Sequence, residues 1–226
     1  MFATYGPDMR EAFHEQLESI FDDLASICSL VEEAVSSATE ALLRGDAEIA
    51  ERVISADAVI DRARERVEDS AFSLLSLQAP VAGDLRVVVA ALRMVTELER
   101  MGDLSVHVAK IARLRVPNVA VPEEIRPTVS RMAEVAEDMV SRVKDVITSR
   151  DVTAAIAVAR DDEEMDQLRR QSFTELLSDD WTNGVEAAVD VALLGRYYER
   201  IADHAVSVAN RVVYIVTVEF PQALRA

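Results

Sequence analysis

The stretch Glu99-Arg100-Met101-Gly102-Asp103 recurs 100 residues later as Glu199-Arg200-Ile201-Ala202-Asp203, and this repeat decides the fold. Upstream, Asp46-Ala47-Glu48-Ile49-Ala50 is matched 105 positions later by Asp151-Val152-Thr153-Ala154-Ala155. Because the two offsets differ by five residues, a change of length lies in the turn before the last element of each half, where loops tolerate it best. A repeat of this length indicates two copies of one structural unit rather than a solenoid array.

Apolar residues recur with a helical period along most of the chain. Gly45 suits a left-handed helix end, and Asp46 and Asp151 suit the capping position of the helices that follow them. Residues 116–127 contain three prolines and no apolar stripe, so we expect them to form a linker. The expected helices span about residues 17–43, 49–74, 85–115, 128–149, 152–177 and 185–216.

Long helices joined by short turns favour antiparallel neighbours. The sequence therefore predicts an all-α protein made of two tandem antiparallel three-helix bundles that are related by internal duplication. We place the first bundle at residues 1–117 and the second at residues 118–226.

The chain is strongly acidic, with 41 Asp and Glu against 24 Lys and Arg and a formal net charge of −17. Because nucleic acids and anionic lipids both require a basic surface, we expect the protein to bind neither. Its apolar runs are far shorter than the ~20 residues that cross a bilayer, which argues against membrane insertion. Residues 1–8 lack a signal-peptide pattern, and the single cysteine, Cys28, cannot form an internal disulfide, so we expect a cytoplasmic protein. Cys28 lies in an apolar helical stripe, where it is expected to act as a small buried hydrophobe.

Each half carries two pairs of carboxylates spaced four residues apart, on helices that are expected to be neighbours. Residues at this spacing project from one face of a helix, so the two pairs of a half can form a cluster of four acids. Such a cluster requires raised pKa values, a hard cation such as Mg, Mn, Ca or Fe, or arginine counterions, and a plain solvated helix face is the alternative. The candidate metal ligands are Asp57, Asp61, Glu99 and Asp103 in the first half and Asp162, Asp166, Glu199 and Asp203 in the second.

Other motifs are sparse. Arg86 follows Asp84 at the start of the third expected helix, a place that suits an acidic partner group, with a helix-capping charge pair as the alternative. Glu11 and His14 fit one half of a di-iron Glu-x-x-His motif, but the sequence has no second copy. Since Gly-rich phosphate loops, Cys clusters and nucleophile motifs are also missing, we expect a protein that is not an enzyme. Two alternatives stay open: a ferritin-like metal oxidase or metal-storage protein, and a structural dimerisation module.

Together these segments resemble the PhoU family of phosphate-uptake regulators. The resemblance rests on the two E-R-small-small-D motifs and on residues 78–86, Gln-Ala-Pro-Val-Ala-Gly-Asp-Leu-Arg, and it extends over residues 14–212. It implies a cytoplasmic regulator, peripheral to the membrane through its partners. Those partners would be the ATPase subunit of the phosphate ABC transporter and a phosphate-sensing histidine kinase, which it holds in the signalling-off state when phosphate is sufficient.

The resemblance also implies metal ions, with Fe, Mn, Mg or Zn as candidates, on the acidic faces named above, and a homodimer is expected. We assign partner contacts to Asp84 and Arg86 and to the two arginines of the repeated motif, Arg100 and Arg200, which are also possible counterions of the acids.

The two halves depart differently from the family pattern. The family often has His directly after the motif Asp and Asn three residues later. Here the first half has Leu104 and His107, whereas the second keeps His204 but has Ser207. The second half also has no counterpart of Asp84-Leu85-Arg86. We therefore expect the two halves to differ in function.

Overall fold

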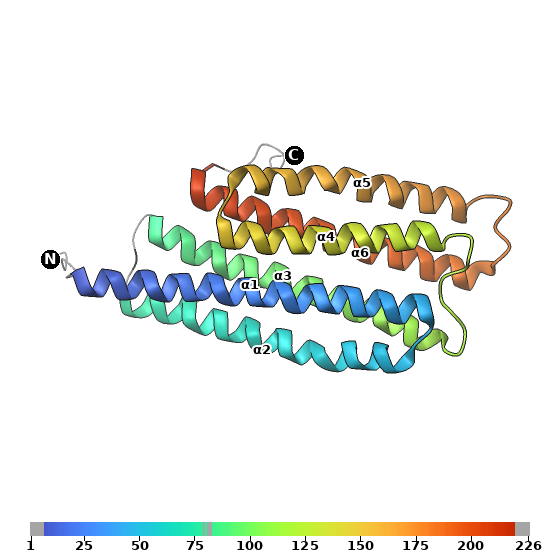
Figure 1. Ribbon diagram of the computed structural model, residues 1–226, viewed down its shortest axis with the longest axis horizontal. Helices are drawn as coiled ribbons and strands as arrows, with labels where there is room; N and C mark the ends of the chain where they lie inside the picture. The colour runs from blue at the N-terminus through green and yellow to red at the C-terminus, as the bar shows by residue number, and fades with distance from the viewer. Residues whose placement is uncertain (1–6, 79, 81–82, 220–226) are drawn as a thin grey trace.

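The computed structural model is all α-helical in the part that it describes, residues 7–78, 80 and 83–219 (Figure 1). This confirms the predicted fold class. The six helices are α1 (Pro7–Arg44), α2 (Ala47–Gln78), α3 (Gly83–Arg115), α4 (Arg126–Ser149), α5 (Val152–Leu176) and α6 (Gly184–Thr217). Within those ranges no helix is long and apolar enough to cross a membrane.

The helix ends follow the local signals in the sequence. Gly45 has a φ of 66°, and the carboxylate of Asp46 accepts hydrogen bonds from the backbone N–H groups of Glu48 and Ile49 at 2.9 and 3.0 Å. Asp151 caps α5 in the same way: its carboxylate accepts hydrogen bonds from the backbone N–H groups of Thr153 and Ala154 at 2.7 and 3.2 Å. These contacts confirm the two predicted caps, since each satisfies N–H groups that the first helical turn leaves unpaired.

Two helices begin earlier than the apolar pattern indicates. Helix α1 begins at Pro7 rather than near residue 17, and its buried stripe extends back to Phe13. Helix α4 begins at Arg126, so Pro127 lies in its first turn instead of in the linker. Proline is tolerated there because the first N–H groups of a helix have no partner within the helix. Most of the segment examined for a signal peptide, and residues 79 and 81–82 before α3, lie outside the described residues.

The three helices of each half contact one another, and the halves are joined along α1–α4 and α3–α6. Figure 1 shows the two groups of three lying side by side with their long axes roughly parallel. Their buried apolar residues form one continuous cluster that includes members from all six helices. The boundary between residues 117 and 118 stays a prediction, because the two halves share this interior.

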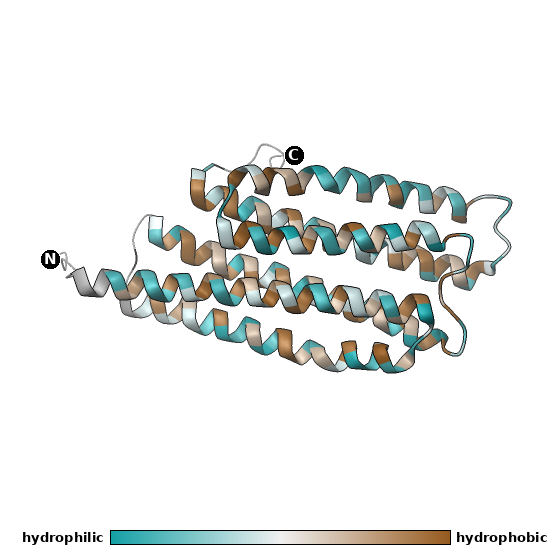
Figure 2. Ribbon diagram, viewed as in Figure 1, coloured by the Kyte–Doolittle hydropathy of each residue, from teal (hydrophilic) through white to brown (hydrophobic). Residues whose placement is uncertain are grey.

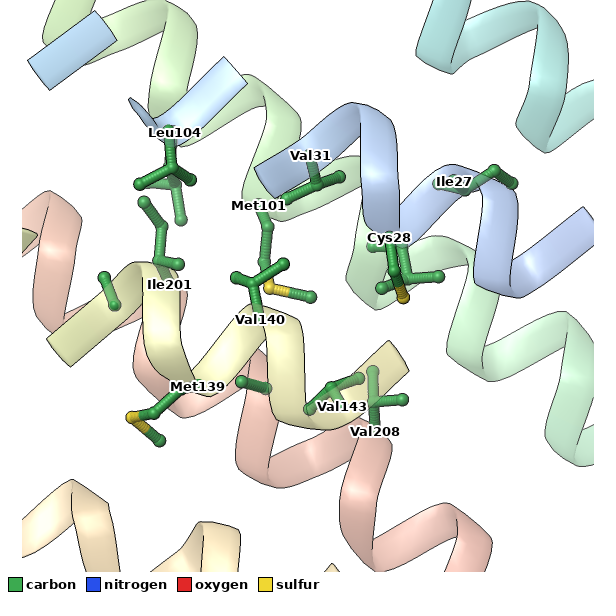
Figure 3. Packing of buried hydrophobic residues seen from close by; sticks show 14 of the residues in the cluster. Ile27, Cys28, Val31, Met101, Leu104, Met139, Val140, Val143, Ile201 and Val208 are labelled. Carbon is green, nitrogen blue, oxygen red and sulfur yellow. The ribbon is translucent and has the colours of Figure 1, made fainter. Parts of the chain in front are cut away.

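The centre of the shared interior is packed with small and flexible side chains. Figure 3 shows Cys28 of α1, Met101 of α3, and Val140 and Val143 of α4 converging between the halves, close to Val208 of α6. Each is at most 1% exposed. Burial raises the pKa of the Cys28 thiol to about 12, so this cysteine is a neutral packing residue, as the sequence predicted.

Helix α5 is the most peripheral of the six. Only four of its residues are buried, and Figure 2 shows it hydrophilic over much of its length. Its position leaves the acidic side chains of α5 at the surface, next to α6.

Candidate functional site

The four acids of the first half lie on adjoining faces of α2 and α3, and all four are partly buried. Burial raises the pKa of Asp57, and so do the negative charges of Asp61 and Asp103. Burial likewise raises the pKa of Glu99, with further contributions from Asp103 and Asp61. Because acids of both helices act on each other, the structure brings the predicted four together as one acidic surface, which we call the first acidic patch.

Arginine partly neutralises this patch. A guanidinium nitrogen of Arg100 lies 3.1 Å from a carboxylate oxygen of Asp103, and another lies 3.7 Å from Glu99. Arg100 is well exposed, so this pairing is screened by solvent. Arg100 thus acts as the counterion that the sequence offered as an alternative to a partner contact.

The second acidic patch, formed by Asp162, Asp166, Glu199 and Asp203, is organised differently. The pKa of Asp162 is raised to about 6, first by burial and then by the charges of Asp203, Asp166 and Glu199. Burial and the negative charge of Glu199 also raise the pKa of Asp203, whereas the positive charges of Arg196, His204 and Arg200 lower it. These shifts place all four acids within electrostatic reach of one another.

Glu199 differs from its counterpart in the first half because two arginines hold it. It is buried, accepts a hydrogen bond of 2.9 Å from Arg169 of α5, and is also bonded by Arg196. Charge-assisted bonds of this kind fix a carboxylate strongly. The two halves are therefore inequivalent at the very position where their sequences match.

The patches do not form a ready metal centre. Across the described ranges, no three His, Cys, Asp or Glu side chains are placed so that they could hold one ion. The carboxylates are hard oxygen donors of the right kind, but they are not gathered around a common point, and Glu199 is already held by guanidinium groups. Metal ligation by the eight acids stays a prediction that requires side-chain rotation.

The histidines make contacts that periodicity alone does not specify. The Nδ1 atom of His204 lies 2.6 Å from Oε2 of Glu97 on α3. His107 stacks on Tyr197 of α6 with ring centroids 5.3 Å apart, and its charged form would also act on Asp57. The ring of His14 lies edge-on to Phe13, with centroids 5.8 Å apart. Two of the three histidines thus join the halves.

Arg86 lies in a hollow of about 260 Å³ where α3 begins and α6 ends, which we call the arginine pocket. Its guanidinium lies over the ring of Tyr214, 5.9 Å from the centroid. Burial lowers the pKa of Arg211, and so does the neighbouring positive charge of Arg93. The lining residues are Leu85, Arg86, Val89, Ala90, Arg93, Arg211 and Tyr214.

Sequence reasoning found only one of the three arginines in this pocket. Arg86 and Arg93 are seven residues apart and so share a helix face, which the sequence could have revealed. Arg211 comes from the other half and depends on how the halves pack. Asp84 lies in the first turn of α3, where a negative charge is favourable, and Arg200 is exposed beside Asp203.

The fold and these surfaces define a duplicated six-helix protein with two acidic patches and one basic pocket. Comparison with known proteins agrees: the family model of the PhoU domain matches residues 24–112 and 129–212. The chain belongs to the PhoU family.

Two relatives extend over nearly the whole chain. The phosphate-specific transport system accessory protein PhoU homolog 2 of Mycobacterium tuberculosis is 48% identical over 213 residues, which is 94% of this chain and 100% of the relative. Homolog 1 of Mycobacterium leprae is 46% identical over 214 residues, 95% of this chain and 96% of the relative. The crystal structure of PhoU from Pseudomonas aeruginosa superposes with a TM-score of 0.84 at 26% identity, and the match extends over 92% of this chain and 100% of that one. These findings do not support the alternative of a metal oxidase or metal-storage protein.

Proposed function

We propose that this protein regulates phosphate uptake and phosphate-starvation signalling as an adaptor rather than as an enzyme. It would act in the cytoplasm, beside the membrane, between the ATPase subunit of a phosphate ABC transporter and a phosphate-sensing histidine kinase, and would restrain both when phosphate is sufficient. The observation that carries the proposal is the 48% identity, over the full length of the relative, with a phosphate-specific transport system accessory protein.

An adaptor changes the state of a kinase only if it binds the two states with different affinity. The arginine pocket is the surface that best suits such a contact. It concentrates three guanidinium groups beside the exposed side chains of Leu85 and Val89, on a protein whose net charge is −17. An acidic segment with an apolar residue would be attracted to this pocket and repelled by most of the remaining surface.

The test is to measure binding of the purified ATPase subunit, and of the cytoplasmic part of the kinase, to the full chain. We expect the double variant Arg86→Glu/Arg93→Glu to weaken at least one of the two complexes by tenfold or more. Arg44→Glu is the control, because Arg44 is exposed at the far end of α1 and pairs with Glu40 of its own helix. In cells, the double variant should release the starvation response at high phosphate.

Two outcomes would count against these ideas. If the wild-type chain binds neither partner at any phosphate concentration, the adaptor function is refuted. If it binds both and the double variant binds equally well, the adaptor function survives but the arginine pocket is not its contact surface.

Metal binding and dimer formation are separate proposals on which no step of the adaptor function depends. The first acidic patch is the better candidate for a cation, since its acids raise one another's pKa and the arginine that contacts them directly, Arg100, is exposed to solvent.

A further inference from the structure

A groove of about 860 Å³ lies between α1 and α2 in the first half, with α3 as its floor. Leu30 and Ala34 of α1 face Ile49 and Val53 of α2 across it. On the floor, Gly102 lets the side chain of Ile60 on α2 come close, because a Cβ atom there would lie 2.9 Å from Cδ1 of Ile60 and that side chain would have to shift. The groove is thus an apolar channel along the seam of two helices, with the first acidic patch at one side through Asp57.

The internal duplication shows why this groove is open. In the second half the corresponding seam runs between α4 and α5, and 105 residues separate equivalent positions. Ser37 and Ala56 of the groove correspond to Arg142 and Asp161, which form an ion pair that spans α4 and α5. Arg131 and Glu164, 2.7 Å apart, bridge the same seam.

A third difference adds to the opening. Ala34 corresponds to Met139, which is fully buried in the second half. Figure 3 shows Met139 on α4 pointing away from Met101 and Val140, toward the other side of the helix. The small residues Ala34, Ser37 and Ala56 of the first half therefore stand where a long apolar side chain and an ion pair occupy the second. The opening is a property of the first half and not a requirement of the repeated fold.

The charge around the groove is mainly negative. Among its lining residues, Glu33, Glu48, Glu51 and Asp57 are acidic, and Arg52 is the single basic one. A basic residue from outside the lining, Arg113, compensates Glu51 at 2.6 Å. The rim keeps an excess of negative charge over an apolar floor.

We propose that this groove binds a basic amphipathic helix of a partner protein, with the apolar face of that helix inserted between α1 and α2 and its Lys or Arg residues against the acidic rim. An apolar groove that accepts one face of a helix is a recurrent mode of protein recognition. A second copy of this chain is a poor occupant of this groove, because a surface of a protein with charge −17 lacks the basic residues that the acidic rim would attract.

The groove is distant from the arginine pocket. It lies along the part of α2 that follows the α1–α2 turn, whereas the pocket lies at the opposite end of the molecule, where α3 begins and α6 ends (Figure 1). A helix bound in the groove leaves the pocket accessible. The inference does not depend on the adaptor function proposed above.

The test uses the full chain and three fluorescent 18-residue peptides: an amphipathic helix of Leu and Lys, the same residues scrambled so that no apolar face forms, and an amphipathic helix of Leu and Glu. Binding is followed by fluorescence anisotropy at physiological salt. We expect the amphipathic Leu/Lys helix to bind at least tenfold more tightly than either of the other two.

The decisive variant transfers the second-half residues into the groove, as Ala34→Met/Ser37→Arg/Ala56→Asp. It leaves the net charge unchanged, and all three residues are good or acceptable in helices. We expect it to weaken binding of the Leu/Lys helix at least tenfold. A second variant, Glu33→Gln/Glu48→Gln, removes rim charge without filling the groove and should weaken binding severalfold.

The matched control, Glu40→Gln/Glu65→Gln, removes the same charge at exposed positions that do not line the groove and should bind like the wild type. The proposal is overturned if the triple variant binds the Leu/Lys helix as tightly as the wild type, or if the scrambled peptide binds equally well. It is also overturned if light scattering shows a dimer that the triple variant dissociates, because the groove would then be occupied by a second copy.

Discussion

One buried hydrogen bond joins the two halves through side chains, and its two partners should respond unequally to mutation. The hydroxyl oxygens of Thr39 on α1 and Tyr198 on α6 lie 2.8 Å apart. Oγ1 of Thr39 also lies 2.8 Å from the carbonyl oxygen of Val35. Because a hydroxyl carries one hydrogen, Thr39 donates to the Val35 carbonyl and accepts from Tyr198.

This direction sets the size of each effect. Tyr198→Phe removes a donor but leaves Thr39 bonded to Val35, so it should cost about 0.5–1.5 kcal/mol of unfolding free energy. Thr39→Val keeps the side-chain volume but leaves the hydroxyl of Tyr198, which is wholly buried, without its acceptor. That change should cost about 1–3 kcal/mol, and the double variant should cost less than the sum of the single ones by roughly 1 kcal/mol.

The assay is urea unfolding followed by circular dichroism, with midpoints and slopes compared at one protein concentration. Thr96→Val is the matched control, because Thr96 is exposed and likewise donates to the carbonyl four residues before it. Its effect should stay below about 0.5 kcal/mol. The reasoning is refuted if Tyr198→Phe costs as much as Thr39→Val, or if the two costs simply add.

Two further predictions concern the acidic patches. Asp162 has a folded-state pKa of about 6, above its ordinary value, so its charged form destabilises the fold and this loss grows as pH rises from about 4 to 6. Asp162→Asn should therefore raise the free energy of unfolding at pH 7 by up to about 1 kcal/mol after solvent screening, and with it the melting temperature. The gain should vanish by about pH 3.5, and a pH-independent gain would contradict this account. Adding Mn²⁺ should raise the melting temperature less in Glu99→Ala/Asp103→Ala than in Glu199→Ala, because Glu199 is already bonded to two arginines and is the weaker ligand. If Mg, Mn, Fe and Zn all leave the melting temperature of the wild type unchanged, metal binding is refuted.

The sequence predicted the helices well because their signals are local. The caps at Asp46 and Asp151 involve only a side chain and N–H groups two and three residues later. The spacing of apolar residues can likewise be read within a single helix. The expected start of α4 is two residues too late, because the three prolines of residues 116–127 indicate a linker although the first helical turn accepts proline.

The candidate site was predictable where it depends on one half. Spacing and duplication placed each set of four acids together, and the structure agrees. The bond between His204 and Glu97 and the contribution of Arg211 to the arginine pocket were not predictable, because both depend on the angle at which the two halves pack. The repeat shows that Ala34 corresponds to Met139. The sequence alone does not show that Ala34 lines a groove while Met139 is buried in the second half.

The common interior of the two halves has a mechanical consequence. Side chains such as Met101 and Val140 would meet water if the halves swung apart, at about 25 cal/mol for every Å² of apolar area exposed. The molecule therefore lacks the loose joint by which many two-part proteins open and close around a ligand. We therefore expect a partner bound at one end to move the molecule as a whole, since separating the halves would expose this interior.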